Sequence, residues 1–310
     1  MHALITGGAG FIGSHIVEQL QGQAHIRVLD NFRSGNRENL RGLDVEIITG
    51  SITDRDTVRK AMAGIDVVFH LAALVSVPES IQRPLDCEAI NGLGLLNVLE
   101  EAAAAGVKKL CFSSSAAVYG NRPETPKRED LPPAPLSPYA ITKLAGEYYC
   151  DLFTREHGLP TVSLRYFNVF GPRQDPNSAY AAAVPAFIAR ALANHPLRIY
   201  GDGEQTRDFI SVRDIAAANL FFALESPATG VFNVACGQAT SINTLARTIL
   251  RLTGSAAAVD HAPARPGDIR HSLADTARLT TAGFTPRHET DSTLAETIAS
   301  FQLLPSEPRK

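Results

Sequence analysis

The chain has 310 residues, of which 45% are hydrophobic and 20% charged, and its formal net charge is -3. These proportions are typical of a globular protein with a large core, and the absence of clustered Lys or Arg argues against nucleic acid or an anionic membrane as the main partner. The four cysteines form no CxxC pair and the nine histidines form no HExxH pattern, so a metal site has no support. No segment approaches the roughly 18 apolar residues that span a bilayer. We therefore expect a cytoplasmic protein.

The first half of the chain alternates short apolar runs with helical patterns. Strands are predicted at 2–6, 25–29, 45–49, 66–71, 109–113 and 161–165, and helices at 11–21, 53–63, 88–105 and 139–157. Strands that are apolar on both faces and alternate with helices predict a parallel sheet covered by helices.

The pattern changes after Asn168, where turn signals surround one helix near 184–193. Sheet elements are predicted at 209–212 and 231–234 and a helix at 241–253, and 255–310 is mixed. We predict an α/β fold, a Rossmann-like doubly wound parallel sheet with a smaller, interleaved C-terminal domain. The sheet would use 1–167 and a returning segment, 208–235, and the smaller domain 168–207 and 236–310. Ligands of open α/β sheets bind at the carboxyl edge, beneath such a second domain.

A glycine-rich turn, GGAGFIG at 7–13, follows the first predicted strand and opens the first helix. Gly7 permits a tight turn, Gly10 lets the backbone approach a pyrophosphate, and Gly13 allows close packing of helix on sheet. Asp30 ends the second strand and would accept hydrogen bonds from an adenosine ribose while repelling a 2′-phosphate. NAD is therefore favoured over NADP. Nearby Arg33 is the one feature that would favour NADP. The alternative is a turn that binds nothing.

A tyrosine and a lysine form the candidate catalytic pair. Tyr139 and Lys143 are four residues apart on a predicted helix and share one face. Hydride transfer needs a partner that moves the alcohol proton, and a neighbouring ammonium and a positive nicotinamide ring would lower the pKa of the phenol for this task. Ser115 ends the run Ser113-Ser114-Ser115 after a strand, and its hydroxyl would bridge the substrate oxygen and the phenol. The alternative is a surface Tyr and Lys on an amphipathic helix.

Together with HLAA (70–73), SSSAAVYG (113–120), SPYAITK (137–143) and LRYFNVFG (164–171), these motifs resemble the extended short-chain dehydrogenase/reductases. Within them the chain is most similar to the UDP-hexose 4-epimerases, through YGDGEQTRDFISVRD (200–214) and RPGDIRHSLAD (265–275), to about residue 285. The resemblance implies an NAD-dependent enzyme that inverts carbon 4 of a UDP-sugar through a transient 4-keto intermediate.

The resemblance also assigns site residues. It implies a catalytic set of Ser115, Tyr139 and Lys143. The cofactor-binding candidates are Gly7, Gly10, Phe11, Ile12, Gly13, Asp30, Asn31, Ser34, Gly35, Ser51, Ile52, Leu71, Ala72, Ala73, Ser113, Tyr139, Lys143 and Tyr166. The substrate-binding candidates are Ser115, Tyr139, Asn168, Ala183, Val184, Tyr200, Arg207, Arg265, Asp268 and Ser272. Ser51 stands where the family often has Asp, so the affinity for NAD is expected to differ.

Three family chemistries remain as alternatives. Dehydratases and decarboxylases of this kind carry an acidic residue before Val/Leu-Tyr-Gly, whereas 115–120 here reads SAAVYG, which disfavours them. A glucuronate 4-epimerase would need a cation for the sugar carboxylate, and Arg173 or Arg270 would serve. Ser272 is small at the family's gate position, which implies that N-acetylated sugars are accepted, unless it is an ordinary loop residue. A scaffold that only senses NAD is the alternative that is not an enzyme.

The resemblance implies a homodimer through the helices 88–105 and 139–157. The sequence itself shows only helices rich in Leu, Val and Ala, which could equally pack inside one subunit.

Overall fold

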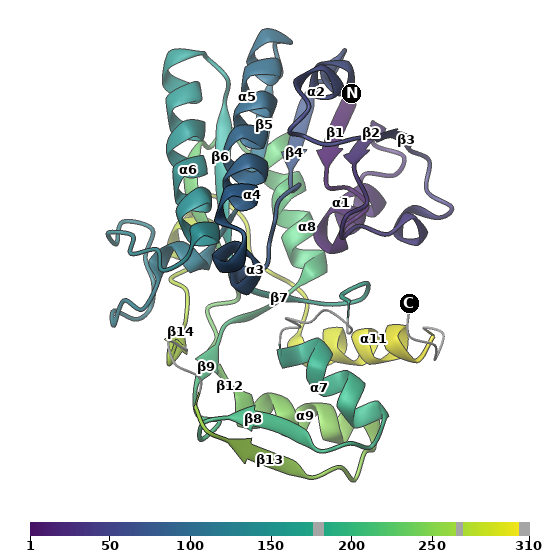
Figure 1. Cartoon of the computed structure of the whole chain (residues 1–310), viewed down its shortest axis with the longest axis vertical. Coiled ribbons are helices and arrows are strands. Elements are labelled where there is room, and N and C mark those ends of the chain that lie inside the picture. The colour runs from purple at the N-terminus through teal and green to yellow at the C-terminus, as the bar shows by residue number, and fades with distance from the viewer. Residues whose placement is uncertain (176–182, 265–268, 304–310) are drawn as a thin grey trace.

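The centre of the protein is a seven-stranded sheet in the order β11-β6-β5-β4-β1-β2-β3, seen in the computed structural model of Figure 1. The structure describes residues 1–175, 183–264 and 269–303. The strands of this sheet are β1 (His2–Thr6), β2 (His25–Asp30), β3 (Glu46–Thr49), β4 (Val67–His70), β5 (Lys109–Ser115), β6 (Thr161–Tyr166) and β11 (Gly230–Val234). Every neighbouring pair is parallel. The predicted Rossmann-like doubly wound sheet is confirmed.

Helices cover both faces of the sheet. One face carries α1 (Phe11–Gln19), α8 (Val212–Leu220) with the π-helical Phe221–Glu225, and the short η1 (Arg37–Leu40); the other carries α2 (Arg55–Met62), α5 (Gly94–Ala104) and α6 (Pro138–Glu156). Alternate residues of β1 serve the two faces, since Ala3 and Ile5 join the cluster under α1 and α8, and Leu4 joins the cluster under α2, α5 and α6. Each such buried Leu or Ile contributes about 1.5–3 kcal/mol to stability.

The long helix predicted at 88–105 is present and contains a π-helical turn. The structure has α4 (Pro84–Glu88), a π-helical turn (Ala89–Leu93) and then α5. The side chain of Asn91, at the centre of that turn, accepts from Leu74 N at 2.7 Å and donates to Leu74 O at 3.0 Å. The π-helical turn thus presents a polar side chain to the loop that contains Leu74. A short helix that the sequence did not indicate, α3 (Val77–Gln82), precedes it.

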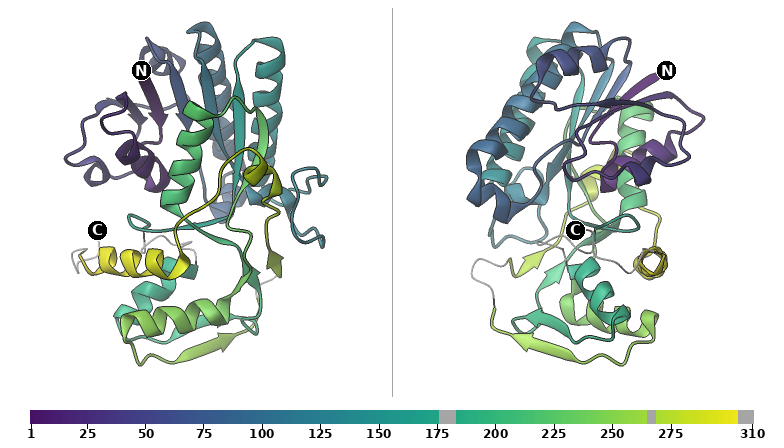
Figure 2. Two further views of the ribbon diagram at one scale, coloured as in Figure 1. Left: turned by 180° about the vertical axis from the view of Figure 1, so that it is seen from behind. Right: turned by 45° about the vertical axis from the view of Figure 1, so that its right-hand side comes forward.

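A smaller lobe lies below the large sheet in Figure 1, and Figure 2 shows the same separation from two other directions. It contains α7 (Ala183–Leu192), α9 (Ile242–Thr253) and α11 (Thr290–Gln302), with β8 (Leu197–Tyr200) paired parallel to β13 (Val259–Ala262). These elements share a hydrophobic core of their own, which includes Phe187, Leu245 and Ile298. The predicted smaller, interleaved C-terminal domain is thus present.

Short strands join the large sheet to the smaller lobe. β7 (Asn168–Phe170) pairs with β10 (Phe209–Ser211), and β9 (Thr206–Arg207) lies between β12 (Thr240–Ser241) and β14 (His271–Ser272). The sheet element predicted at 209–212 is therefore not part of the large sheet, and Val212 already begins α8 because Ser211 caps that helix. The remaining elements are η3 (Ala116–Tyr119) after β5 and α10 (Ala277–Thr281), which packs against β11.

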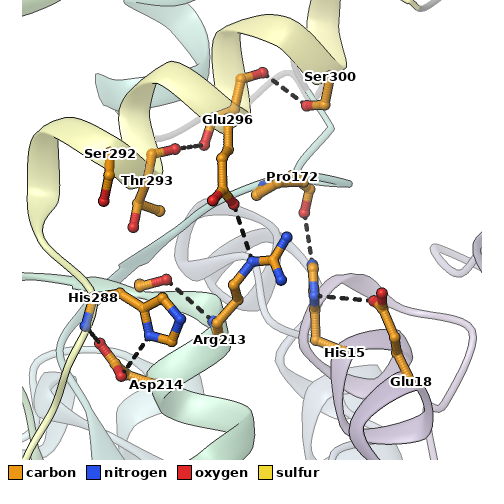
Figure 3. A network of polar contacts seen from close by, with 12 residues as sticks. His15, Glu18, Pro172, Arg213, Asp214, His288, Ser292, Thr293, Glu296 and Ser300 are labelled. Atoms are coloured by element: carbon orange, nitrogen blue, oxygen red, sulfur yellow. Dashed lines mark hydrogen bonds and ion pairs between the residues drawn. The ribbon is translucent and has the colours of Figure 1, made fainter.

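Polar contacts fix the C-terminal helix and α1 to their neighbours (Figure 3). Glu296 of α11 lies 3.0 Å from Arg213 Nε of α8, and Asp214 accepts from His288 N at 3.0 Å. His15 of α1 lies 3.0 Å from the carbonyl oxygen of Pro172, which follows β7. Helices α1 and α8 are thereby bound to segments that lead into the smaller lobe. Within the described residues, no helix has the length and apolar character needed to cross a membrane.

Candidate active site

A cavity of about 1120 Å³ opens at the carboxyl ends of β1, β2, β4, β5 and β6 and extends to the smaller lobe. Every residue that the sequence assigned to the cofactor lines it, as do Ser115, Asn168, Ala183, Val184, Tyr200 and Arg207 of the substrate set. Ser272 is not on its wall; it lies in β14, paired with Arg207 of β9. Arg265 and Asp268 lie outside the described residues. The structure thus gathers most of the candidates around one space.

The glycine-rich turn is shaped for close approach of a ligand to backbone. Gly10 precedes α1 without a side-chain cap, so the first N–H groups of the helix face the cavity as anion donors. A Cβ on Gly13 would lie 2.2 Å from Gly7 O, and one on Gly7, whose φ is +72°, would lie 2.8 Å from Ala72 N. Neither position accepts a side chain, so the turn leaves room at the helix N-terminus for the pyrophosphate of a dinucleotide.

Asp30 is fixed at the end of β2 by the backbone of two loops. Its Oδ2 accepts from Ala9 N at 2.9 Å and its Oδ1 accepts from Phe32 N at 2.8 Å. A carboxylate has about four acceptor positions, so lone pairs remain for a ribose. Arg33, the residue that favoured NADP, forms an ion pair with Glu79 at 2.5 Å. With that guanidinium engaged, the site suits an unphosphorylated ribose.

The candidate catalytic residues come together where α6 meets β5. Pro138 opens α6, and Ser137 caps it by accepting from Ala140 N at 3.2 Å. The Tyr139 phenol lies beside the Ser115 side chain, whose Oγ accepts from Ala117 N at 3.1 Å. Lys143 Nζ donates to the carbonyl oxygen of Ser113 at 2.7 Å and lies 5.8 Å from the centre of the Tyr139 ring. Phenol, ammonium and serine hydroxyl thus share one wall of the cavity, the arrangement needed to move a proton to and from an alcohol.

The electrostatics of this pair differ from the expectation. Burial raises the pKa of the Tyr139 phenol, and the nearby Ser115 side chain opposes that rise only in part. Burial also lowers the pKa of Lys143 from 10.5 to about 8. The predicted lowering of the phenol pKa, which also involves the nicotinamide ring, is therefore not seen in the chain alone. Both groups have lost their water, and the ammonium is directed at Ser113 O instead of the phenolic oxygen.

Tyr166 lines the cavity, but its hydroxyl points away from it into the protein. The hydroxyl donates to Asn219 Oδ1 at 3.0 Å and accepts from Asn219 Nδ2 at 2.8 Å, against α8. Burial raises its pKa, so it remains a neutral phenol. Tyr166 therefore offers its ring and backbone to a ligand, and not its oxygen.

Several lining residues were not found from the sequence. One of them is Arg198, which lies two residues before the expected Tyr200 on β8. The two side chains therefore project from the same face of that strand onto the cavity. The alternation in Leu-Arg-Ile-Tyr was a usable signal for Arg198. Gln205 and Ile90 also line the cavity, and nothing in their local sequence marks them. Among the described residues, no group of three or more His, Cys, Asp or Glu side chains could hold a metal ion.

Comparison with known proteins gives the family. The NAD dependent epimerase/dehydratase family matches residues 3–235. The chain belongs to this family. A UDP-glucose 4-epimerase of Mycolicibacterium smegmatis is 37% identical over 97% of this chain and 99% of its own length. The solved UDP-N-acetylglucosamine 4-epimerase of Methanobrevibacter ruminantium, in complex with UDP-N-acetylmuramic acid, is 44% identical, with a TM-score of 0.93 over 97% of this chain and 98% of that one.

A solved UDP-glucose 4-epimerase of Thermus thermophilus in complex with NAD is 36% identical, with a TM-score of 0.90 over 98% of this chain and 99% of that one. NAD is the cofactor of the family, and the prediction of NAD is confirmed. The relatives also include a UDP-N-acetyl-alpha-D-glucosaminuronate decarboxylase of Bacillus cytotoxicus, 37% identical over 84% of this chain and 83% of its own length. Within the epimerase/dehydratase family, the protein is an NAD-dependent enzyme of UDP-sugars, and the reaction type has to be argued from its site.

Proposed function

We propose that this protein is a 4-epimerase that interconverts UDP-glucose and UDP-galactose, and also UDP-N-acetylglucosamine and UDP-N-acetylgalactosamine. The observation that carries the proposal is the cluster of Tyr139, Ser115 and Lys143 on one cavity wall, beside a turn shaped for a dinucleotide. Epimerisation needs one group that moves a proton back and forth, and this cluster supplies it.

In the proposed mechanism, Tyr139 takes the proton of the 4-hydroxyl and later returns it. When bound, NAD would supply the hydride acceptor and donor for carbon 4. Ser115 holds the substrate oxygen beside the phenol, and Lys143 keeps a positive charge on that wall. Arg207 is held in place by donating to Ile269 O at 2.7 Å, and we propose that it and Asn168 bind the diphosphate while the sugar turns over.

Dehydration and decarboxylation are less well supported. The turn η3 after Ser115 carries Ala116 and Ala117, where an acid would be needed. Of the described residues that line the cavity, only Asp30 and Asp175 have carboxylates, and Asp30 is bound to the backbone of the glycine-rich turn. A second proton-transfer group next to Tyr139 is therefore not apparent among these residues.

The two cations considered for a glucuronate carboxylate are engaged elsewhere. Arg173 donates to Glu18 Oε2 at 2.7 Å, and Arg270 forms two bonds with Asp202, at 2.8 and 2.9 Å. Neither arginine lines the cavity. This favours an uncharged hexose over glucuronate.

We further propose a homodimer. Helices α3, α4 and α6 pack on one another and expose large apolar side chains on their outer side, among them Ile81, Leu85, Ile141 and Tyr148. Leu85 is 84% exposed and Tyr148 62%, and a second copy of the same surface would cover both. This face includes the helix predicted at 139–157, which we expect to pair with the same helix of a second subunit.

The domain boundaries are proposed as they were predicted. Residues 1–167 with 208–235 would form the NAD-binding domain, because β11 completes the large sheet and α8 packs on α1. Residues 168–207 and 236–310 would form the UDP-sugar domain. The cytoplasmic location stays a prediction.

The test is turnover by the purified protein on UDP-glucose, UDP-N-acetylglucosamine and UDP-glucuronate, with Tyr139→Phe as the matched variant. We expect 4-epimers from the first two and a loss of about 10²–10⁴ in kcat for Tyr139→Phe. Near-normal turnover by Tyr139→Phe would exclude the mechanism. NAD binding without conversion of any sugar would instead favour an NAD-sensing scaffold.

A further inference from the structure

A buried ion pair lies next to the catalytic residues, on the same face of α6. Glu147 follows Lys143 by four residues, as Lys143 follows Tyr139, so the three side chains form one line along the helix. Glu147 is 3% exposed, and its partner, Arg165 of β6, is 4% exposed. The mechanism above uses the first two residues of this line and leaves the third without a role.

Glu147 is held by two neighbouring strands. Arg165 Nε donates to Glu147 Oε1 at 2.8 Å and Nη2 donates to Oε2 at 2.7 Å, a two-pronged ion pair. Ser114 of β5 donates from Oγ to Glu147 Oε1 at 2.5 Å. Ser114 and Arg165 are direct partners in the β5–β6 pairing, so one carboxylate binds the two strands at the same level.

The approach of α6 to the sheet is close at Gly146. A Cβ on Gly146 would lie 2.5 Å from the ring of Phe112, which means that only glycine lets the helix come so near to β5. Phe112 and Ser114 project from the same face of β5. On the same strand, the carbonyl oxygen of Ser113 accepts from Lys143, and Ser115 lies beside Tyr139. A small shift of the helix along the strand would move both catalytic contacts together.

We propose that Glu147 is a positioning residue for the proton-transfer pair. Its contacts with Arg165 and Ser114 fix where α6 stands on β5, so that the Tyr139 hydroxyl reaches Ser115 and the Lys143 ammonium reaches Ser113 O. Stability alone is a weak reason for the pair, since buried ion pairs are often replaced by apolar side chains without loss. As far as turnover is concerned, the inference rests on the proposed function.

Ser114→Ala is the mildest test, because it removes one hydroxyl and keeps the ion pair. A misplacement of about 1 Å costs up to roughly a hundredfold in rate, so we expect kcat to fall by at least about tenfold and KM for the UDP-sugar to change less than about twofold. Glu147→Gln should lower kcat further, and Ser114→Ala keeps the test informative if Glu147→Gln does not fold. The control is Thr297→Val, which removes a fully buried hydroxyl that donates to Thr293 O at 2.6 Å in α11 and should leave kcat unchanged.

A second measurement needs no turnover. The ionisation of Tyr139 is followed by ultraviolet difference titration, with the Tyr139→Phe form of each protein subtracted to remove the other six of the seven tyrosines. Ser114→Ala should raise the apparent pKa of Tyr139, because the groups that stabilise its phenolate are drawn away, and Thr297→Val should not. An unchanged kcat and an unchanged titration in Ser114→Ala would overturn the inference. If the unaltered enzyme converts no UDP-sugar, the proposed function fails, while the titration still decides the positioning role.

Discussion

Replacing Lys143 by Met should make the protein more stable at neutral pH while making it a poorer catalyst. Burial lowers the pKa of Lys143 from 10.5 to about 8, and at about 1.4 kcal/mol per pKa unit the difference corresponds to about 3 kcal/mol. Below pH 8 the lysine is protonated in both the folded and the unfolded chain, so the full cost of holding a buried ammonium opposes folding. As the pH rises from about 8 to 10.5, the folded protein releases the proton first and stability is recovered.

Met fills a similar volume without a charge, so Lys143→Met removes this cost. It also removes the bond from Nζ to Ser113 O, worth about 1.5 kcal/mol. The net expectation is a gain of about 1.5 kcal/mol in the free energy of unfolding at pH 7.5. At pH 10 the unaltered protein recovers about 2.5 kcal/mol, so the variant should then be the less stable of the two by about 1 kcal/mol.

The assay is urea unfolding of nucleotide-free protein at pH 7.5 and pH 10, with kcat measured on the same preparations after NAD is added back. Lys60→Met, at an exposed position on α2, is the control for loss of a single positive charge. The reasoning is refuted if Lys143→Met is less stable than the unaltered protein at pH 7.5, or if the difference between them is the same at both pH values.

Three further outcomes are expected. Gly13→Ala should abolish retention of NAD, measured as nucleotide released on denaturation, because the added Cβ would lie 2.2 Å from Gly7 O; co-purified NAD at normal occupancy would contradict the geometry. Ser272→Tyr should suppress turnover of N-acetylated sugars and spare UDP-glucose, because Ser272 pairs with Arg207 of the cavity wall, and equal loss on both sugars would exclude a gate. Ile141→Glu should convert the proposed dimer to a monomer in light scattering, because a charge would be buried in the apolar face of α6; a charge change at an exposed position, Glu289→Gln, should not alter the mass.

The parallel sheet could be predicted because its strands are buried on both faces and read as short apolar runs. Val67, Val68 and Phe69, for example, are all buried in β4, so no polar residue interrupts the pattern. The π-helical turn between α4 and α5 could not be predicted from periodicity. It depends on hydrogen bonds from Asn91 to Leu74, which lies 17 residues away in the sequence.

The site also has features that the sequence predicts and features that it does not. The glycine-rich turn, Asp30 and the pair Tyr139 and Lys143 could be found because local spacing determines their geometry. The direction of the Tyr166 hydroxyl could not, because Asn219 comes from a helix that follows 53 residues later. The sign of the pKa change at Tyr139 was also missed, since spacing places a cation nearby but says nothing about how much water both groups lose.

Burial at this wall connects the proton chemistry to the cofactor. The chain alone holds Tyr139 as a neutral phenol and weakens the hold of Lys143 on its proton, so neither residue is prepared to take a proton from an alcohol. A second positive charge close to the phenol favours the phenolate, and in a dry site its effect is larger than in water. Oxidised NAD carries such a charge on its nicotinamide ring, and the reduced form does not. We therefore expect Tyr139 to become a base only while a hydride acceptor is present, so that proton and hydride leave the sugar together.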